Sequence, residues 1–200
     1  MHPDRRFHWE DRDAMRAFVG ERGFGMVCAS TPQGPRVAHV AVLWLGDDRI
    51  GFHLANANVL TPVLDGAPAL FVAQGEDAYV SPDWYGMADQ VPTWNYRAVE
   101  LSGTVSAMTG PPTADLLDGL SAAREAHLSP KPAWTREKMT PGRFDRMLGA
   151  ITGFILDVAE WRGTAKFGQD KPAAARLAVA DALDAAGNAP VARVMREGRA

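Results

Sequence analysis

The sequence predicts an α+β protein, mainly β, with a small closed barrel and peripheral helices. Short apolar runs separated by turn residues fill the first half of the chain, which is typical of antiparallel strands. Segments with helical periodicity follow from about residue 110, and one strand-like segment returns near residue 150. Many short antiparallel strands followed by helices favour a closed barrel over a parallel sheet.

The first elements are a helix and a set of strands. Residues 11–22 favour a helix because Phe18 and Val19 lie on one apolar face, and Gly23 follows as a stop. Residues 56–66 are expected to form a loop with a short helix. Turns containing Pro, Gly or Asp separate the strands, which we place at 24–30, 36–45, 49–54, 68–73 and 78–80.

A long strand is predicted over residues 93–107, after a loop. Its second half alternates with period two, so Val99 and Leu101 face one side. The same period puts Asn95 and Arg97 on that side as well. Polar groups on the core side of a strand are costly unless a ligand, a partner or water satisfies them.

The remaining segments complete the barrel and add helices to it. We expect a helix from Thr113 to about Ala126, a second from Thr140 and Pro141 to Gly149, a last barrel strand at 150–161, a helix from Pro172 to Gly187, and a final helical turn at 191–195. Residues 1–200 are thus predicted to form a single domain, with helical additions at about 111–149 and 172–197.

Composition narrows the classes of protein. Apolar residues make up 46% of the chain and charged residues 22%, which suits a globular core. The formal net charge of −3 argues against a surface built mainly for nucleic acid. Cys28 is the single cysteine, so no internal disulfide forms, and we expect it to be buried and inert. Without a disulfide framework, an apolar leader or a run of ~20 apolar residues, we expect a cytoplasmic protein with no membrane span.

Familiar catalytic and metal-binding motifs are absent from the sequence. It has no phosphate-binding loop, dinucleotide fingerprint, paired-cysteine spacing or nucleophile elbow. The histidines lack helical metal-ligand spacing, so no metal site is expected; they are His2, His8, His39, His53 and His127. No side chain stands out as a general acid or base, and the catalytic residues stay unknown.

Polar and aromatic residues gather in two loops. The segment 53–58, His-Leu-Ala-Asn-Ala-Asn, combines small and polar residues that allow close approach to an anion, although an ordinary strand-to-helix turn has similar residues. Segments 78–85 and 91–96 are rich in Tyr and Trp, and Ser81 and Thr93 are potential phosphate donors. Such residues suit a flat heteroaromatic ligand, a dimer interface or a packed loop.

These segments carry a resemblance to a known family. Tyr79-Val-Ser-Pro-Asp-Trp-Tyr followed by Val91-Pro-Thr-Trp-Asn-Tyr resembles the PaiB-like family of FMN-binding negative transcriptional regulators. Shorter matches agree with it: Arg6-Phe, Ala38-His-Val, His53-x-Ala-x-Ala-Asn, Ile151-Thr-Gly-Phe-Ile and Lys166-Phe-Gly-Gln.

The resemblance implies a split β-barrel of the pyridoxamine-phosphate-oxidase type. It further implies a homodimer with flavin mononucleotide (FMN) at the subunit interface. The flavin contacts carried over by motif are His39, Val40, His53, Ala55, Asn58, Tyr79, Ser81, Trp84, Thr93, Trp94, Asn95 and Lys166.

Four positions depart from the family's pattern. Asn56 stands where the family has Arg, Val59 where it has Pro, Gly168 where it has Ser, and Asp170 where it has Asn. The changes remove one cation and add one carboxylate near the expected phosphate. Lys166 then becomes the main cation that the resemblance offers to that phosphate.

Three functions follow from these observations. The first is an FMN-dependent oxidoreductase or a redox-responsive flavin binder, because the cofactor supplies redox chemistry that the side chains lack. The second is a DNA-binding negative regulator, which the family resemblance alone implies; the only basic cluster is a weak one at Arg193, Arg196 and Arg199. The third is haem binding or degradation, with His39 or His53 as ligand.

Overall fold

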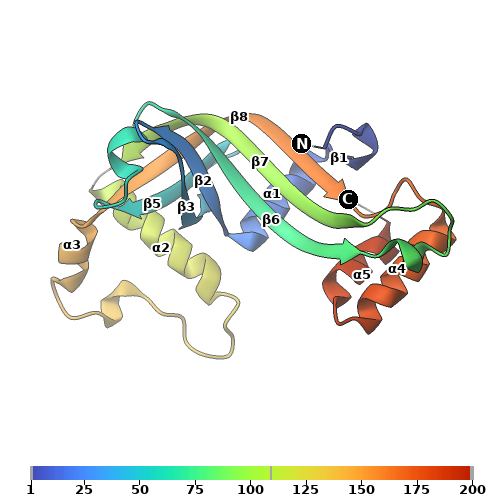
Figure 1. The fold of residues 1–200 in the computed structure, drawn as a ribbon. Coiled ribbons are helices and arrows are strands. Elements are labelled where there is room, and N and C mark those ends of the chain that lie inside the picture. Colours follow the sequence, from blue (N-terminus) through green and yellow to red (C-terminus); the bar gives the residue numbers. More distant parts are fainter. Residues whose placement is uncertain (1, 109, 199–200) are drawn as a thin grey trace. The chain divides into compact units, whose positions relative to one another are not determined.

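The computed structural model describes residues 2–108 and 110–198 (Figure 1). The chain divides into two compact units. Unit 1 comprises the described residues of Met1–Arg16, Ala73–Glu100 and Arg162–Ala200. Unit 2 comprises those of Ala17–Val72 and Leu101–Trp161.

An antiparallel sheet contributes strands to both units. Its order is β3-β2-β6-β7-β8-β5-β4, and β1 pairs with β8. Three long strands begin in one unit and end in the other. The strands are β1 (His8–Trp9), β2 (Phe24–Thr31), β3 (Gly34–Ala41), β4 (Leu43–Trp44), β5 (Arg49–Ala55), β6 (Pro68–Val80), β7 (Thr93–Met108) and β8 (Ile151–Lys166).

Unit 2 contains the barrel. β5 pairs with β8 from Arg49 opposite Asp157 to Ala55 opposite Ile151. Alternate residues of β5 point inward, so Phe52 is fully buried and stacks on Phe154 of β8 at 5.5 Å between ring centroids. β3, at one end of the strand order, contacts β5 near the other end. This contact brings the two ends of the sheet together, as a small barrel requires.

The helix α2 (Pro111–Glu125) covers β4 and β5 of the barrel, and Figure 1 shows it beside β5. Glycines allow this close approach. A Cβ atom on Gly51 would lie 2.7 Å from Leu116 of α2, and one on Gly119 would lie 2.6 Å from Leu43. Apolar burial between helix and sheet then holds the helix in place. Unit 2 also contains η2 (Thr61–Val63), η4 (Arg136–Lys138), and α3 (Arg143–Leu148).

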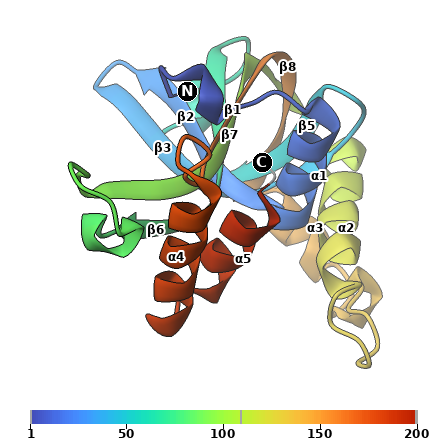
Figure 2. The same ribbon diagram turned by 90° about the vertical axis from the view of Figure 1, so that its right-hand side faces the viewer.

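Unit 1 combines the far parts of the long strands with helices. β1 pairs with the end of β8, with Trp9 opposite Gly163. α4 (Ala173–Ala185) and α5 (Ala189–Glu197) pack against each other, as Figure 2 shows. The unit also contains η1 (Arg5–Phe7) and η3 (Pro82–Tyr85), and α1 (Arg12–Arg22) crosses from unit 1 into unit 2.

The strands differ from the sequence prediction at three places. The predicted strands 68–73 and 78–80 form one strand, β6, because Glu76 in the polar stretch between them pairs with Arg97 of β7. The predicted strand 36–45 is divided into β3 and β4. The last strand continues to Lys166 instead of ending at residue 161, and pairing with β1 supports this extension.

The helix starts also differ. α2 begins at Pro111 after Gly110, so Thr113 is not its cap. Thr113 is instead buried and its hydroxyl donates to the carbonyl oxygen of Met108 at 3.0 Å. α3 begins at Arg143 after Gly142, which is two residues beyond Pro141 at the predicted start. Both starts have a glycine with positive φ, which sets the entry angle without a polar cap.

Cys28 is half-buried and not in the core, which corrects the sequence prediction. Alternation along β2 buries Val27 and Ala29 and turns Cys28 to the other face. Burial still raises the pKa of its thiol, so the unreactive thiol form persists at neutral pH. In the described part of the chain, the helices are too short or too polar to cross a membrane.

Candidate functional site

Unit 1 contains a polar cavity of about 340 Å³ where several predicted flavin contacts meet. Thr93 and Asn95 reach it from the start of β7, and Lys166 reaches it from the end of β8. Of the twelve predicted flavin contacts, these three line the same cavity. Its other lining residues are His2, Asp4, Arg6, Phe7, Tyr85, Asp89, Gln90, Val91, Gly168, Asp170 and Lys171.

Lys166 is held inside this cavity by contacts with β7 and η1. Its amino group donates a hydrogen bond to the hydroxyl of Thr93 and lies 5.8 Å from the centroid of the Phe7 ring. Burial lowers the pKa of Lys166, the nearby charge of Lys171 lowers it further, and Asp170 opposes the change. A bound anion would therefore stabilise a cation that the protein alone leaves poorly compensated.

The other cations of the cavity are paired with carboxylates. Arg6 holds Asp4 at 2.6 Å, and its hydrogen bonds lower the pKa of Asp4 to about 2. Lys171 pairs with Asp170 at 3.0 Å. Within the described residues, Lys166 thus stands out as the cavity cation whose bonded partner is a hydroxyl group.

Asn95 is the most deeply buried polar side chain of the cavity, with 1% of its surface exposed. Its Nδ2 approaches the sulfur of Met195 at 3.4 Å, which is a weak acceptor. Its Oδ1 has no hydrogen-bond partner among the described residues. The alternation along β7 predicted this inward position, and an unpaired buried oxygen is costly unless a ligand or water donates to it.

The remaining predicted contacts of unit 1 lie toward its surface. Tyr79 is 46% exposed and Trp94 is 56% exposed, and their rings meet edge to face at 6.2 Å between centroids. Ser81 precedes η3, and Trp84 lies within it. Ser81 makes no capping bond with its side chain, so its hydroxyl is not required by the local turn.

Unit 2 holds the other predicted contacts, on β3, on β5 and in the turn after β5. Val40 is buried, whereas His39 is exposed and stacks on Phe24 at 6.4 Å between ring centroids. His53 and Ala55 belong to β5, and Asn58 follows in the turn. The predicted set is therefore divided between the units, seven residues in unit 1 and five in unit 2.

The turn after β5 was expected to bind an anion, but its polar groups bond to the protein. The backbone N–H of Asn58 donates to Ala55, and the Asn58 side-chain oxygen accepts from the N–H of Leu60 at 2.9 Å. Asn56, at the family's Arg position, donates from Nδ2 to the carbonyl oxygen of Gly149 at 2.9 Å and accepts from Thr152 at 2.8 Å. These bonds connect the turn to the start of β8.

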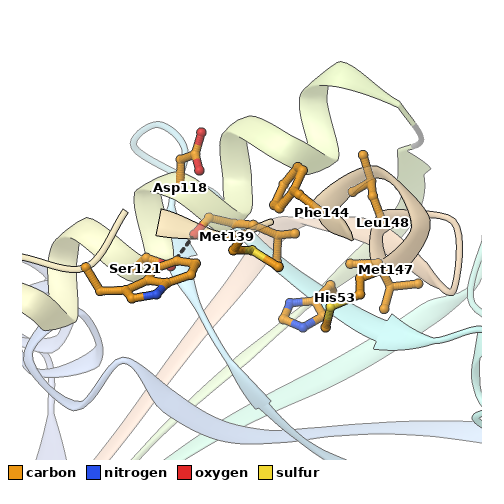
Figure 3. A pocket seen from close by; sticks show the side chains of 10 residues that line it. His53, Asp118, Ser121, Met139, Phe144, Met147 and Leu148 are labelled. Carbon is orange, nitrogen blue, oxygen red and sulfur yellow. Dashed lines mark hydrogen bonds between the residues drawn. The ribbon is translucent and has the colours of Figure 1, made fainter. Parts of the chain in front are cut away.

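A second cavity, of about 300 Å³, lies in unit 2 and is mainly apolar. Figure 3 shows His53 below Met139 and beside Met147, with Phe144 nearby. Burial lowers the pKa of His53, so its imidazole is neutral at neutral pH. Its Nδ1 is shielded from solvent and has no hydrogen-bond partner among the described residues.

Sequence reasoning missed several residues of both cavities. Arg6 entered the resemblance only as part of a motif, and Lys171 is not among the predicted contacts, yet both line the polar cavity. The apolar cavity depends on Met139, in the largely irregular segment before α3, and on Phe144 of α3. The sequence placed Phe144 in a helix but did not indicate that it would line a cavity. No group of three or more metal-ligating side chains occurs in the described ranges.

Comparison with known proteins supports this architecture. The sequence model of the family described as "Putative FMN-binding domain" matches residues 1–160. The chain is also 31% identical over 159 residues to "Protease synthase and sporulation protein PAI 2" of Bacillus subtilis, covering 77% of this chain and 75% of that protein.

Solved structures share the fold at low sequence identity. The FAD and heme binding protein of Mycobacterium smegmatis superposes with a TM-score of 0.59 at 18% identity, over 80% of this chain and 74% of that chain. The flavocytochrome Anf3 of Azotobacter vinelandii gives a TM-score of 0.56 at 19% identity, over 84% and 73%.

The matches confirm three predictions. The PaiB-like resemblance is correct, and so is the α+β split barrel of the pyridoxamine-phosphate-oxidase type. FMN as the cofactor is confirmed by the family match. The polar cavity of unit 1 fits part of this group, because it offers a cation, a hydroxyl and a buried unpaired acceptor.

Proposed function

Because the chain belongs to the FMN-binding family that matches residues 1–160, we propose that it is an FMN-dependent oxidoreductase and works as a homodimer. One observation carries this proposal: Lys166, Thr93 and the unpaired oxygen of Asn95 line one cavity. A cation beside a hydroxyl suits phosphate, and a buried acceptor suits a hydroxyl of the ribityl chain. No side chain of the cavity is assigned a catalytic role.

The residues of this cavity bind and orient the cofactor. Lys166 would neutralise phosphate charge as a flexible point cation, and the Thr93 hydroxyl, which accepts from Lys166, would donate its own hydrogen to a phosphate oxygen. Asn95 accepts from the ribityl chain and thereby satisfies its Oδ1. When bound, FMN supplies one- and two-electron transfer that no side chain here provides.

The turn after β5 is a weaker candidate for the phosphate. Its N–H groups at Asn56 and Asn58 already donate to backbone oxygens, and the Asn56 side chain bonds to Gly149 and Thr152. Breaking such bonds would offset the gain from a bound anion. We therefore assign the phosphate to Lys166 and Thr93.

Exposed apolar residues of unit 1 support the homodimer. Trp94 and Tyr79 form an exposed aromatic pair, and Val91 is 73% exposed. Large apolar side chains grouped on a surface favour association, and two-fold symmetry is the commonest arrangement of soluble oligomers.

DNA binding and haem binding receive less support. Arg196, in the weak C-terminal basic cluster, pairs with Asp181 and Asp184 at 2.9 Å each, while Arg199 lies outside the described residues. The chain is acidic overall, so we expect at most weak, sequence-independent binding to DNA. For haem, His39 is exposed, and the apolar cavity beside His53 has no cation among its lining residues to pair with propionates.

The visible spectrum of freshly purified protein tests the cofactor. Flavin absorption that is retained on gel filtration supports the proposal, whereas a Soret band or a colourless protein that fails to take up added FMN contradicts it. The redox activity is tested anaerobically by adding NADH or NADPH and following flavin bleaching. Bleaching faster than that of free FMN supports an oxidoreductase, and no acceleration with either donor favours a redox-responsive flavin binder instead.

A further inference from the structure

The apolar cavity of unit 2 has the features of a separate small-molecule site. Its walls come from β5, α2, the irregular segment before α3, α3 itself and the start of β8. Leu117, Trp134, Met139, Phe144 and Met147 supply apolar and aromatic surface around a volume of about 300 Å³. Ligand sites are typically concave, mainly apolar and marked by few polar groups, as this one is.

The cavity is open to solvent through apolar side chains. Met147 is 55% exposed and Trp134 is 39% exposed, although both line the cavity. Methionine adapts its shape to a ligand, and its sulfur makes favourable contacts with aromatic rings. A planar apolar molecule entering between them would cover surface that the free protein leaves in water.

The described lining residues of the cavity include no lysine or arginine that would hold an anionic ligand. Asp118 is the one charged residue among its described lining residues, and this carboxylate is paired with Arg136 at 3.4 Å. The hydroxyl of Ser121 donates its hydrogen to the backbone oxygen of Leu117 within α2, so it can offer a ligand only an acceptor. The imidazole of His53 differs from it, because its shielded Nδ1 has no partner among the described residues.

We propose that this cavity binds a small neutral aromatic molecule carrying one hydrogen-bonding group, which pairs with the imidazole of His53. A neutral imidazole has one donor and one acceptor nitrogen, so it accommodates a hydroxyl, amide or indole N–H. Burial keeps His53 neutral, and no lysine or arginine among the described lining residues compensates a ligand carboxylate. This inference stands apart from the proposed FMN site in unit 1.

Methionine-methyl NMR of the full chain tests the site, with 2-naphthol as the probe. The chain has eight methionines, of which Met139 and Met147 line the cavity. Ring currents of a bound naphthol should shift these two methyl signals saturably and leave those of Met87 and Met195 in place. Met139→Leu and Met147→Leu assign the signals. Uniform shifts, or none at saturating probe, would overturn the proposal.

Matched variants and ligands test the chemistry. Met147→Glu should weaken 2-naphthol binding at least tenfold, whereas Met87→Glu, at another exposed methionine outside the cavity, should leave it unchanged. The anion 2-naphthoate should bind at least tenfold more weakly than 2-naphthol. Equal affinity of the two ligands would contradict the neutral class of ligand.

The role of His53 is tested by removing the hydrogen bond from either side. His53→Phe keeps a ring of similar size and should weaken 2-naphthol binding about two- to tenfold, the range of one neutral hydrogen bond. Binding of naphthalene, which has no hydroxyl, should stay the same. If both ligands lose affinity equally, His53 only shapes the cavity and the proposed pairing is wrong.

Discussion

The amino group of Lys166, at the end of β8, donates a hydrogen bond to the hydroxyl of Thr93, at the start of β7. The pairing brings together a cation and a hydroxyl that are 73 positions apart in the sequence. Both groups face a cavity in which the other cations are held by carboxylates. Among the cations of this cavity, Lys166 with Thr93 should therefore give a bound phosphate the most favourable interaction.

Lys166→Ala should weaken FMN binding at least tenfold and leave the fold intact. A charge-assisted hydrogen bond contributes about 1.5–3 kcal/mol, or roughly 10- to 150-fold in affinity. Titration of FMN fluorescence at fixed salt measures this. Lys171→Ala should do much less, because Asp170 already offsets the Lys171 charge. If wild type and Lys166→Ala bind FMN with equal affinity, the phosphate must instead be bound by neutral donors such as Ser81.

Asn95→Leu should separate stability from cofactor binding. The substitution removes a buried oxygen without a described partner and keeps a similar volume, so the FMN-free protein should gain up to about 1 kcal/mol in unfolding free energy. FMN affinity should fall, since the ribityl chain loses an acceptor. Urea unfolding and FMN titration measure the two effects. Asn188→Leu, in the same unit but away from the cavity, is the control and should not change FMN affinity.

Asn56→Ala should cost stability and not FMN affinity. The side chain makes one hydrogen bond to Gly149, just before β8, and one to Thr152 at the start of β8, each contributing about 0.5–1.5 kcal/mol. Urea unfolding of Asn56→Ala, Thr152→Val and the double variant gives the coupling between the two side chains. A large loss of FMN affinity in Asn56→Ala, with unfolding unchanged, would instead place the phosphate at this turn.

The stability of the protein should depend on the protonation of His53. Burial lowers its folded pKa below the ordinary value of 6.5, so the unfolded chain binds the proton more readily. The contribution of neutral His53 to the unfolding free energy is fully present above pH 6.5 and is lost as the pH falls through the folded pKa. Wild type should therefore lose more unfolding free energy than His53→Phe between pH 7.5 and pH 5. Equal losses of unfolding free energy for the two proteins, measured in parallel urea titrations, would rule out this contribution.

A light-scattering mass of about twice 21.6 kDa is expected at micromolar concentration. Trp94→Glu puts a charge into the exposed aromatic pair and should shift the mass toward one chain. Trp134→Glu, at an exposed tryptophan of unit 2, should leave the dimer unchanged. A wild-type mass of one chain would refute the dimer.

The sequence predicted the parts of this structure that follow from local periodicity. Alternation along β7 placed Asn95 on the buried side together with Val99, and both are buried. It could not predict the continuous β6, because the polar residues near Glu76 favour a break until Arg97 of the neighbouring strand pairs with one of them. Cavity residues such as Arg6 and Phe144 escaped prediction for the same reason, since tertiary contacts alone bring them to their sites.

The segment that builds the apolar cavity is inserted between two neighbouring strand ends. A Cβ atom on Gly153, near the start of β8, would lie 2.6 Å from Met108 at the end of β7. Lengthening a segment whose ends are already joined costs little, about 0.6 kcal/mol for each doubling of its length. The largely irregular residues 126–142 between α2 and α3 can thus change in length at little cost, while α2 stays packed on the barrel. Relatives with the same barrel should differ most in the molecules they accept here.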